Sequence, residues 1–142
     1  MAGNALPIWP RIPKIGAGQL TTSVVTGNDL TNAALIFTAD STNGSVSYEI
    51  RVKALPGNNS VATAFRIHIN NGSAVGTSGN NTLILELSLP IITASATLSN
   101  GDYSILMTRG GILLPPSYRV YASIGTSQST GVLSVTAFGG DF

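Results

Sequence analysis

Apolar and polar residues alternate along most of the chain. Between residues 46 and 53, for example, Val46, Tyr48, Ile50 and Val52 occupy every second position, and Ser, Glu, Arg and Lys stand between them. Alternation of this kind places one face of a β-strand against a core and the other against solvent or a partner. The same pattern predicts strands near residues 65–70, 83–89, 118–124 and 133–137, and weaker strands near 21–26, 34–38 and 103–107.

Turn sequences separate these runs. Asn-Gly, Pro-Gly and Gly-Gly pairs supply the positive or fixed φ angles of tight turns, and they occur at 43–44, 56–57, 71–72, 100–101 and 110–111. No segment shows a sustained helical period with a cap. Short strands separated by turns, about eight of them, predict an all-β fold: an antiparallel β-sandwich of jelly-roll type with an extended N-terminal arm.

The first 18 residues differ from the rest of the chain. Pro7, Pro10 and Pro13 fall at every third position, and proline lacks an N–H group and fixes φ, so this segment is excluded from helices and central strands. We expect an extended proline-rich arm over residues 1–18 and a single β-sandwich domain over residues 19–142. The arm is either a loose terminus or a segment that docks on a neighbour. Its candidate partner-binding residues are Ile8, Trp9, Pro10, Arg11, Pro13 and Lys14.

Charged residues are scarce. Asp, Glu, Lys and Arg make up 9% of the 142 residues and hydrophobic residues 43%, whereas soluble domains carry about 25% charged residues. A surface so poor in charge suits a protein that packs against copies of itself or a large partner. The net charge of +1, without a basic cluster, argues against nucleic-acid binding. Apolar stretches stay below about 20 residues and no signal-peptide pattern is present, so we expect a soluble, non-secreted protein with no membrane partner.

No pattern of catalytic or metal-binding residues stands out. His68 lies on the polar face of a predicted strand, where a surface or interface histidine is the expected role. The chain has no cysteine, and its six carboxylates form no calcium-loop pattern, so we expect no metal, no cofactor and no catalytic site. The enzyme hypothesis, a small hydrolase using two acids from Glu49, Glu86 and Asp102, rests only on the number of carboxylates.

Three stretches and the last four residues resemble a known family when taken together. They are residues 10–14 (PRIPK), 61–72 (VATAFRIHINNG), 114–126 (LPPSYRVYASIGT) and 139–142 (GGDF). Their order and spacing, over nearly the whole chain, resemble those of small virion structural proteins encoded by tailed bacteriophages. The resemblance implies a non-enzymatic capsid decoration or cement protein, made in the cytoplasm of the bacterial host. It also implies a homo-oligomer, with a trimer favoured, that binds the major capsid protein on the outer surface of the virion.

A second function within the same virion remains open. β-sandwiches bind glycans through loops at one end, and the long loop over residues 70–81 has the length for such a role. The alternative is therefore a tail-associated module that recognises glycans of the host. The sequence does not decide between the capsid and the tail.

Overall fold

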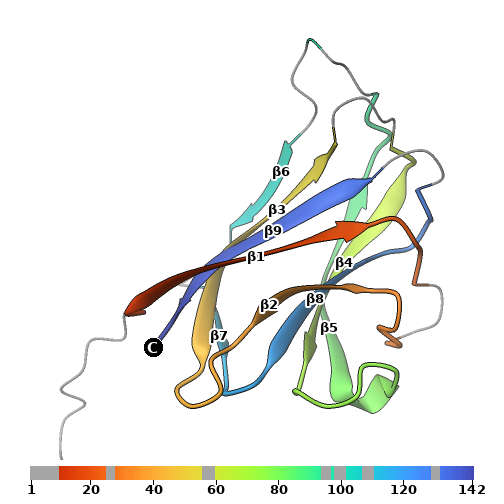
Figure 1. The fold of residues 1–142 in the computed structure, drawn as a ribbon. Coiled ribbons are helices and arrows are strands. Elements are labelled where there is room, and N and C mark those ends of the chain that lie inside the picture. Colours follow the sequence, from red (N-terminus) through yellow and green to blue (C-terminus); the bar gives the residue numbers. More distant parts are fainter. Residues whose placement is uncertain are drawn as a thin grey trace, which may run out of the picture.

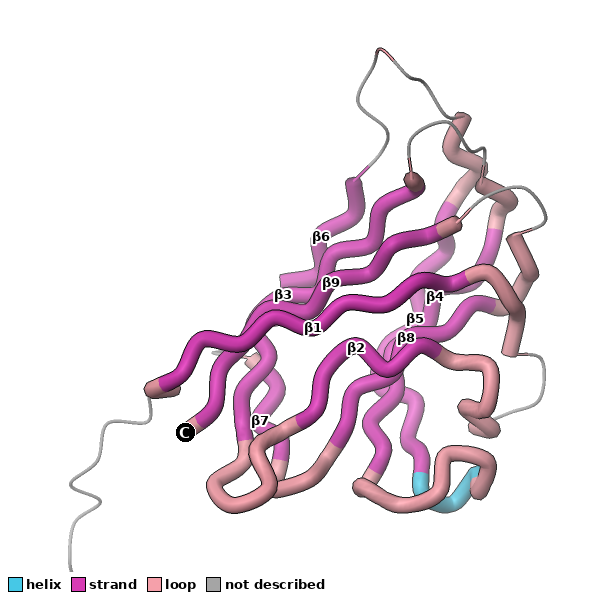
Figure 2. Tube along the Cα trace, viewed as in Figure 1, coloured by secondary structure: helices cyan, strands magenta, loops and turns pink. Residues whose placement is uncertain are grey.

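The structure is a computed structural model that describes residues 10–24, 28–55, 60–93, 97, 102–106, 111–128 and 132–142. Within these residues the chain forms nine strands and one short 3₁₀ turn, Ser78–Asn80. The strands make two antiparallel sheets that lie face to face (Figures 1 and 2). The predicted β-sandwich is confirmed.

The five-stranded sheet has the order β1-β9-β3-β6, with β7 also paired to β3. Its strands are β1 (Ile12–Leu20), β9 (Leu133–Asp141), β3 (Ser45–Ala54), β6 (Asp102–Leu106) and β7 (Ile112–Leu114). The four-stranded sheet has the order β2-β8-β4-β5. Its strands are β2 (Ala34–Thr38), β8 (Arg119–Ile124), β4 (Thr63–Asn70) and β5 (Asn81–Leu89).

The pairing of the strands is nested. β1 pairs with β9, β2 with β8, β3 with β6 and β7, and β4 with β5. The chain is thus one long hairpin, with its tip in residues 71–80, and successive strand pairs of this hairpin alternate between the two sheets. A hairpin rolled up in this way is the jelly-roll arrangement that the sequence predicts.

The core lies between the two sheets and follows the alternation in the sequence. Phe65 and Ile67 on β4 pack against Ile50 on β3 and Val135 on β9, and all four side chains are fully buried. On β3 the alternate residues Arg51 and Lys53 face outward. Apolar positions two residues apart therefore build the sandwich, because a pleated strand presents alternate side chains to one face.

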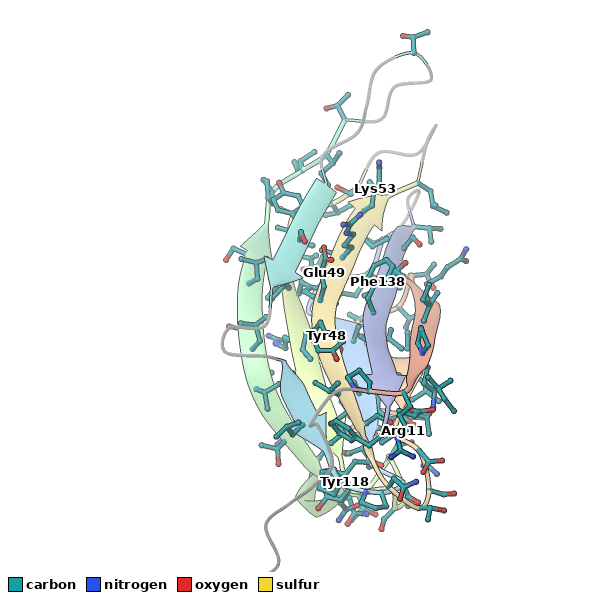
Figure 3. All side chains as sticks on the ribbon, turned by 90° about the vertical axis from the view of Figure 1, so that its left-hand side faces the viewer. Arg11, Tyr48, Glu49, Lys53, Tyr118 and Phe138 are labelled. Carbon is teal, nitrogen blue, oxygen red and sulfur yellow. The ribbon has the colours of Figure 1, made fainter. Side chains whose placement is uncertain are left out.

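The sandwich is closed at one edge and open at the other. At the closed edge β1 and β2 approach so closely that a Cβ on Gly16 would lie 1.8 Å from the carbonyl oxygen of Ile36. At the opposite edge β5 and β6 are the outermost strands of their sheets, and no close β5–β6 packing of this kind is present in the described residues. In Figure 3 the closed edge is on the right and the open edge on the left.

Several expected boundaries differ from those in the structure. β1 covers residues that the sequence assigned to the arm, so the boundary expected at residue 18 lies inside this strand. Pro13 is tolerated there because β1 is an edge strand. No strand forms over residues 21–24 of the segment 21–26; the N–H group of Val24 instead donates to the carbonyl of Ile124, and residues 25–27 lie outside the described residues. The weak strands expected near 34–38 and 103–107 are present as β2 and β6.

Candidate functional site

The outer face of the five-stranded sheet carries a shallow hollow with a volume of about 340 Å³. Figure 3 shows this face, with Glu49 and Lys53 on β3 and Phe138 on β9. Partly exposed hydroxyl, aromatic and basic side chains lie side by side in it, since cross-strand neighbours share one face of a sheet. The residues that line the hollow include Arg51, Lys53, Ala54, Ser134, Thr136 and Phe138.

The polar groups on this face are already engaged with one another. Nε of Arg51 lies 2.6 Å from Oε1 of Glu49, and the Arg51 guanidinium lies 5.3 Å from the centre of the Phe138 ring. The hydroxyl of Ser104 donates to the same carboxylate oxygen of Glu49. The hydrogen bond from Arg51, followed by that from Ser104, lowers the pKa of Glu49 below its ordinary value. Glu49 is therefore an ionised structural partner rather than a proton donor.

The carboxylates do not gather into a catalytic pair. Glu86 binds Arg66 at 2.5 Å on the outer face of the four-stranded sheet, whereas Glu49 lies on the outer face of the other sheet. The side chain of Asp102 lies outside the described residues. In the part of the chain that the structure describes, no group of three His, Cys, Asp or Glu side chains is placed to hold a metal ion. The described residues also include no helix long and apolar enough to span a membrane.

His68 is buried, and the expectation of a surface or interface histidine is wrong. The ring is 0% exposed although it lies on the outward side of β4. The sequence could not show that the 71–80 loop and the residues around Leu30 cover this end of the sheet, where Leu30 donates to the carbonyl of Val75. Nε2 of His68 lies 3.0 Å from the hydroxyl of Ser123, and Nδ1 has no hydrogen-bond partner among the described residues.

The burial of His68 makes the stability of the fold sensitive to acid. Burial, assisted by the charge of Arg66, lowers the pKa of His68 from 6.5 to about 4. Between about pH 6.5 and about pH 4, His68 is protonated in the unfolded chain but neutral in the folded chain. The folded state therefore loses stability as the pH falls through this interval. The expected loss is about 3 kcal/mol, at about 1.4 kcal/mol per pH unit.

Urea unfolding between pH 4 and pH 7, compared with that of His68→Gln, tests this prediction. The carboxylates titrate in both proteins. The difference between the two curves of unfolding free energy against pH therefore gives the contribution of His68. The wild-type protein should lose more stability than the variant in this interval. Two parallel curves would show that His68 is protonated as readily in the folded chain as in the unfolded one.

The structure describes four of the six candidate residues of the arm, Pro10, Arg11, Pro13 and Lys14. Ile8 and Trp9 lie outside the described residues. Arg11 and Pro13 are exposed, and the N–H group of Arg11 donates to the carbonyl of Asp141. Pro10 lies over β9, because a Cβ on Gly140 would approach its Cβ to 2.6 Å. The arm thus leaves the domain beside the last strand.

Lys14 is tied to the fold by its side-chain contacts. Its Nζ lies 3.0 Å from Oδ2 of Asp141 and 5.6 Å from the centre of the Phe37 ring. Asp141 also accepts a hydrogen bond from the hydroxyl of Ser45. The residues of the GGDF terminus therefore have structural roles, since Gly139 and Gly140 leave room for neighbouring strands and Asp141 joins β1 to β3.

Large apolar side chains are exposed on the outer face of the five-stranded sheet and on the edge strands. Ile15 on β1 is 68% exposed and Leu113 on β7 is 64% exposed. Ile15 pairs with Phe138, and Leu113 pairs with Val46, which in turn pairs with Gly140. These registers place Ile15, Phe138 and Leu113 on the same outward face as the hollow. Sequence analysis missed this apolar face because it read β1 as part of the arm.

Comparison with known proteins gives weak similarities only. The structure titled "Capsid of Ralstonia phage GP4" matches over 96% of this chain and 89% of that chain, with 10% identity and a TM-score of 0.49. The structure titled "Cyanophage Pam1 capsid asymmetric unit" matches over 98% of this chain and 91% of that chain, with 12% identity and a TM-score of 0.41. No family model and no curated protein matches the chain. Similarity at this level assigns neither a family nor a function.

Proposed function

We propose that this chain is a virion structural protein of a tailed bacteriophage, a decoration or cement protein that binds the outer surface of the capsid and stabilises contacts between major capsid subunits. The observation that carries the proposal is the outer face of the five-stranded sheet, where Ile15, Leu113 and the Phe138 ring stand beside the paired charges of Glu49 and Arg51. Exposed apolar groups of this kind mark contact surfaces when they lie together. The proposal agrees with the titles of the two capsid structures but does not rest on them.

The N-terminal arm is the second contact surface in this proposal. Proline-stiffened segments lose less conformational entropy when they dock, and Pro7 and Pro10 precede the first strand. In this proposal residues 1–9 reach a neighbouring subunit, with Ile8 and Trp9 as apolar anchors. Because β1 begins at Ile12, a truncation that tests this role should stop before Pro10 and leave the strand in place.

Replacing Ile15 and Leu113 together by serine should abolish capsid binding without unfolding the protein. Each side chain contributes about 1.5–3 kcal/mol when it becomes fully buried, so the pair should lower the affinity at least about a hundredfold. The measurement is co-sedimentation of purified protein with capsids that lack it. If the double variant bound capsids with wild-type affinity, the outer face of the five-stranded sheet would not be the capsid-binding surface.

A matched control lies on the other sheet. Leu35 on β2 is 43% exposed and pairs with Tyr121, so it faces outward from the four-stranded sheet. Leu35→Ser should leave capsid binding unchanged. Mass spectrometry of intact particles gives an independent measure, since a capsid protein is present in hundreds of copies and a tail protein in a few.

The alternative, a tail-associated module that binds host glycans, is favoured by one observation. The hollow on the outer face combines the Phe138 ring with the hydroxyls of Ser134 and Thr136, and aromatic rings with nearby polar groups are common in small-molecule sites. Binding to a glycan array that is lost in Phe138→Ala, together with a copy number of a few per particle, would support this function over the first.

A further inference from the structure

β5 is a long strand edge with no strand beyond it among the described residues. It runs from Asn81 to Leu89 and is the last strand of the four-stranded sheet. Leu83 and Ile84 are 42% and 39% exposed. The register between β4 and β5 shifts at this point, since Ile67 pairs with Leu85 and the next residue of β4 pairs with Leu83. Ile84 is therefore an extra residue, and this bulge leaves two consecutive apolar side chains exposed.

The other long edge of the sandwich is covered by a strand, whereas at β5 the described residues show only the bulge at Ile84. β1 carries Pro13 and Lys14 and is covered by β2, which approaches it within contact distance at Gly16. β5 contains neither proline nor lysine, and its one charged residue, Glu86, is neutralised by Arg66 at 2.5 Å. Proteins block strand edges with such residues, with bulges or with a covering segment. Beyond the bulge, residues 85–89 of β5 have no such block among the described residues and can act as a template for strand addition.

We propose that residues 1–9 of a second copy of this chain add to β5 as an extra strand. Residues 1–9 contain no charged side chain and include Leu6, Ile8 and Trp9, so they match the apolar edge of β5. Alternate residues of an added strand direct their N–H groups toward the partner, so Pro7 is accommodated if Leu6 and Ile8 make the hydrogen bonds to β5. Pro10 then falls on the side that must donate, and pairing ends before it. The inference rests on the docking role of the arm in the proposed function and names its partner.

Pro10 and β5 lie in different parts of the sandwich. Gly139 faces the core ring of Phe37, so Gly140, beneath Pro10, faces outward, and Pro10 lies on the outer face of the five-stranded sheet. β5 lies in the other sheet, three strand spacings or about 14 Å beyond β2. Because β5 of the same chain is this far from Pro10, the partner that we propose is a second copy.

The contact is head-to-tail, because the arm and β5 are different surfaces of the same chain. Such contacts close into a ring when the rotation between copies permits. The same contact also covers the one long edge that the described fold leaves open.

Cross-linking between two variants tests the proposal directly. The chain contains no cysteine, so single cysteines can be placed at Ile8 in one preparation and at Thr82 or Ser88, near the two ends of β5, in another. After mixing, a short bis-maleimide should join Ile8→Cys to one of the two β5 positions in at least tenfold excess over the other pairings. The preferred end gives the direction of the added strand. Gln19→Cys, exposed on β1, is the control and should give little product.

The oligomeric state provides a second readout. Sedimentation of the wild-type protein should show an oligomer, whereas deletion of residues 1–9 and the single change Ile84→Lys should both give monomers at micromolar concentration. Leu35→Lys, at a similarly exposed apolar position on the covered edge, should remain oligomeric. A product with Gln19→Cys equal to that with β5, or an oligomer that survives Ile84→Lys, would overturn the proposal.

The cross-link and the oligomeric state are measured without capsids, so their failure is separate from failure of the proposed function. If Ile84→Lys is monomeric and still sediments with capsids, the two surfaces are independent, as proposed. If the cross-link and the oligomer are absent while Ile15→Ser with Leu113→Ser still lowers capsid binding, the β5 contact is refuted and the capsid role stands.

Discussion

Replacing Gly16 with alanine should destabilise the protein by at least about 3 kcal/mol. The new methyl carbon would lie 1.8 Å from the carbonyl oxygen of Ile36 and 2.8 Å from its carbonyl carbon, and both are backbone atoms that no rotamer change can move. β1 must therefore move away from β2, and the closed edge of the sandwich opens. For a domain of this size the loss corresponds to roughly 10 °C in Tm, measured by thermal unfolding followed by circular dichroism.

The matched control is Gly79→Ala. Gly79 lies in the 3₁₀ turn, and nothing stands within 4 Å of its added Cβ. Its stability should change by less than about 0.5 kcal/mol, as is usual for surface substitutions. If Gly16→Ala were as stable as Gly79→Ala, the approach of β1 to β2 at this edge would not be a constraint on the fold.

Replacing Asn81 with aspartate should cost about 3–5 kcal/mol at neutral pH. The buried amide nitrogen of Asn81 donates to the carbonyls of Asn28 at 2.6 Å and Val75 at 2.7 Å, while its Oδ1 accepts from Asn70 at 2.7 Å. A carboxylate in its place has no proton to donate, and its charge faces carbonyl oxygens. The hydrogen bonds that hold the 71–80 loop and the residues near Asn28 over the four-stranded sheet are lost together.

Asn71→Asp is the control for this change. Asn71 is exposed, and its side-chain oxygen accepts from the N–H group of Ser73 at 3.1 Å, which a carboxylate also does. Its amide nitrogen makes only a long contact of 3.4 Å with Asn80. Urea unfolding at pH 7 should leave Asn71→Asp close to the wild type. Equal stabilities of the two variants would mean that the amide of Asn81 does not hold the loops.

The fold could be predicted where one face of a strand meets the core and the other meets solvent. On β3, Ile50 and Val52 are buried and Arg51 and Lys53 are exposed, as the alternation requires. The same alternation of apolar and polar residues predicted the positions of β2, β4, β8 and β9. Only the pleat and the burial of one face are needed for this prediction, and both are local properties of the sequence.

Bulges and distant partners could not be predicted. The register of β3 shifts between Ser47 and Glu49, so Tyr48 is an extra residue. Val46 is buried but lies outside the core cluster that contains Ile50, although simple alternation groups the two residues on one face. β1 was missed because Pro13 argues against a strand unless its edge position is known, and that position is defined by pairing with β9 at the other end of the chain. Neither feature leaves a local signal.

The candidate site was predicted in part. The scarcity of charge anticipated an apolar contact surface, but its residues, Ile15 and Leu113, lie on strands that the sequence did not reveal. Lys14, expected to meet a partner, is held by Asp141. The burial of His68 depends on loops folding over the sheet, which alternation along one strand does not encode.

The nested pairing of strands also dictates the order in which the protein can fold during its synthesis. The hairpin of β4 and β5 is complete before β6 to β9 are made, whereas β1 is made earlier and pairs only when β9 has emerged. Lys14 and Asp141, for example, are 127 residues apart. Contacts this distant form slowly. In the nascent chain β1 therefore stays unpaired until β9 has been synthesised. We expect newly made chains to need protection from premature association during that interval.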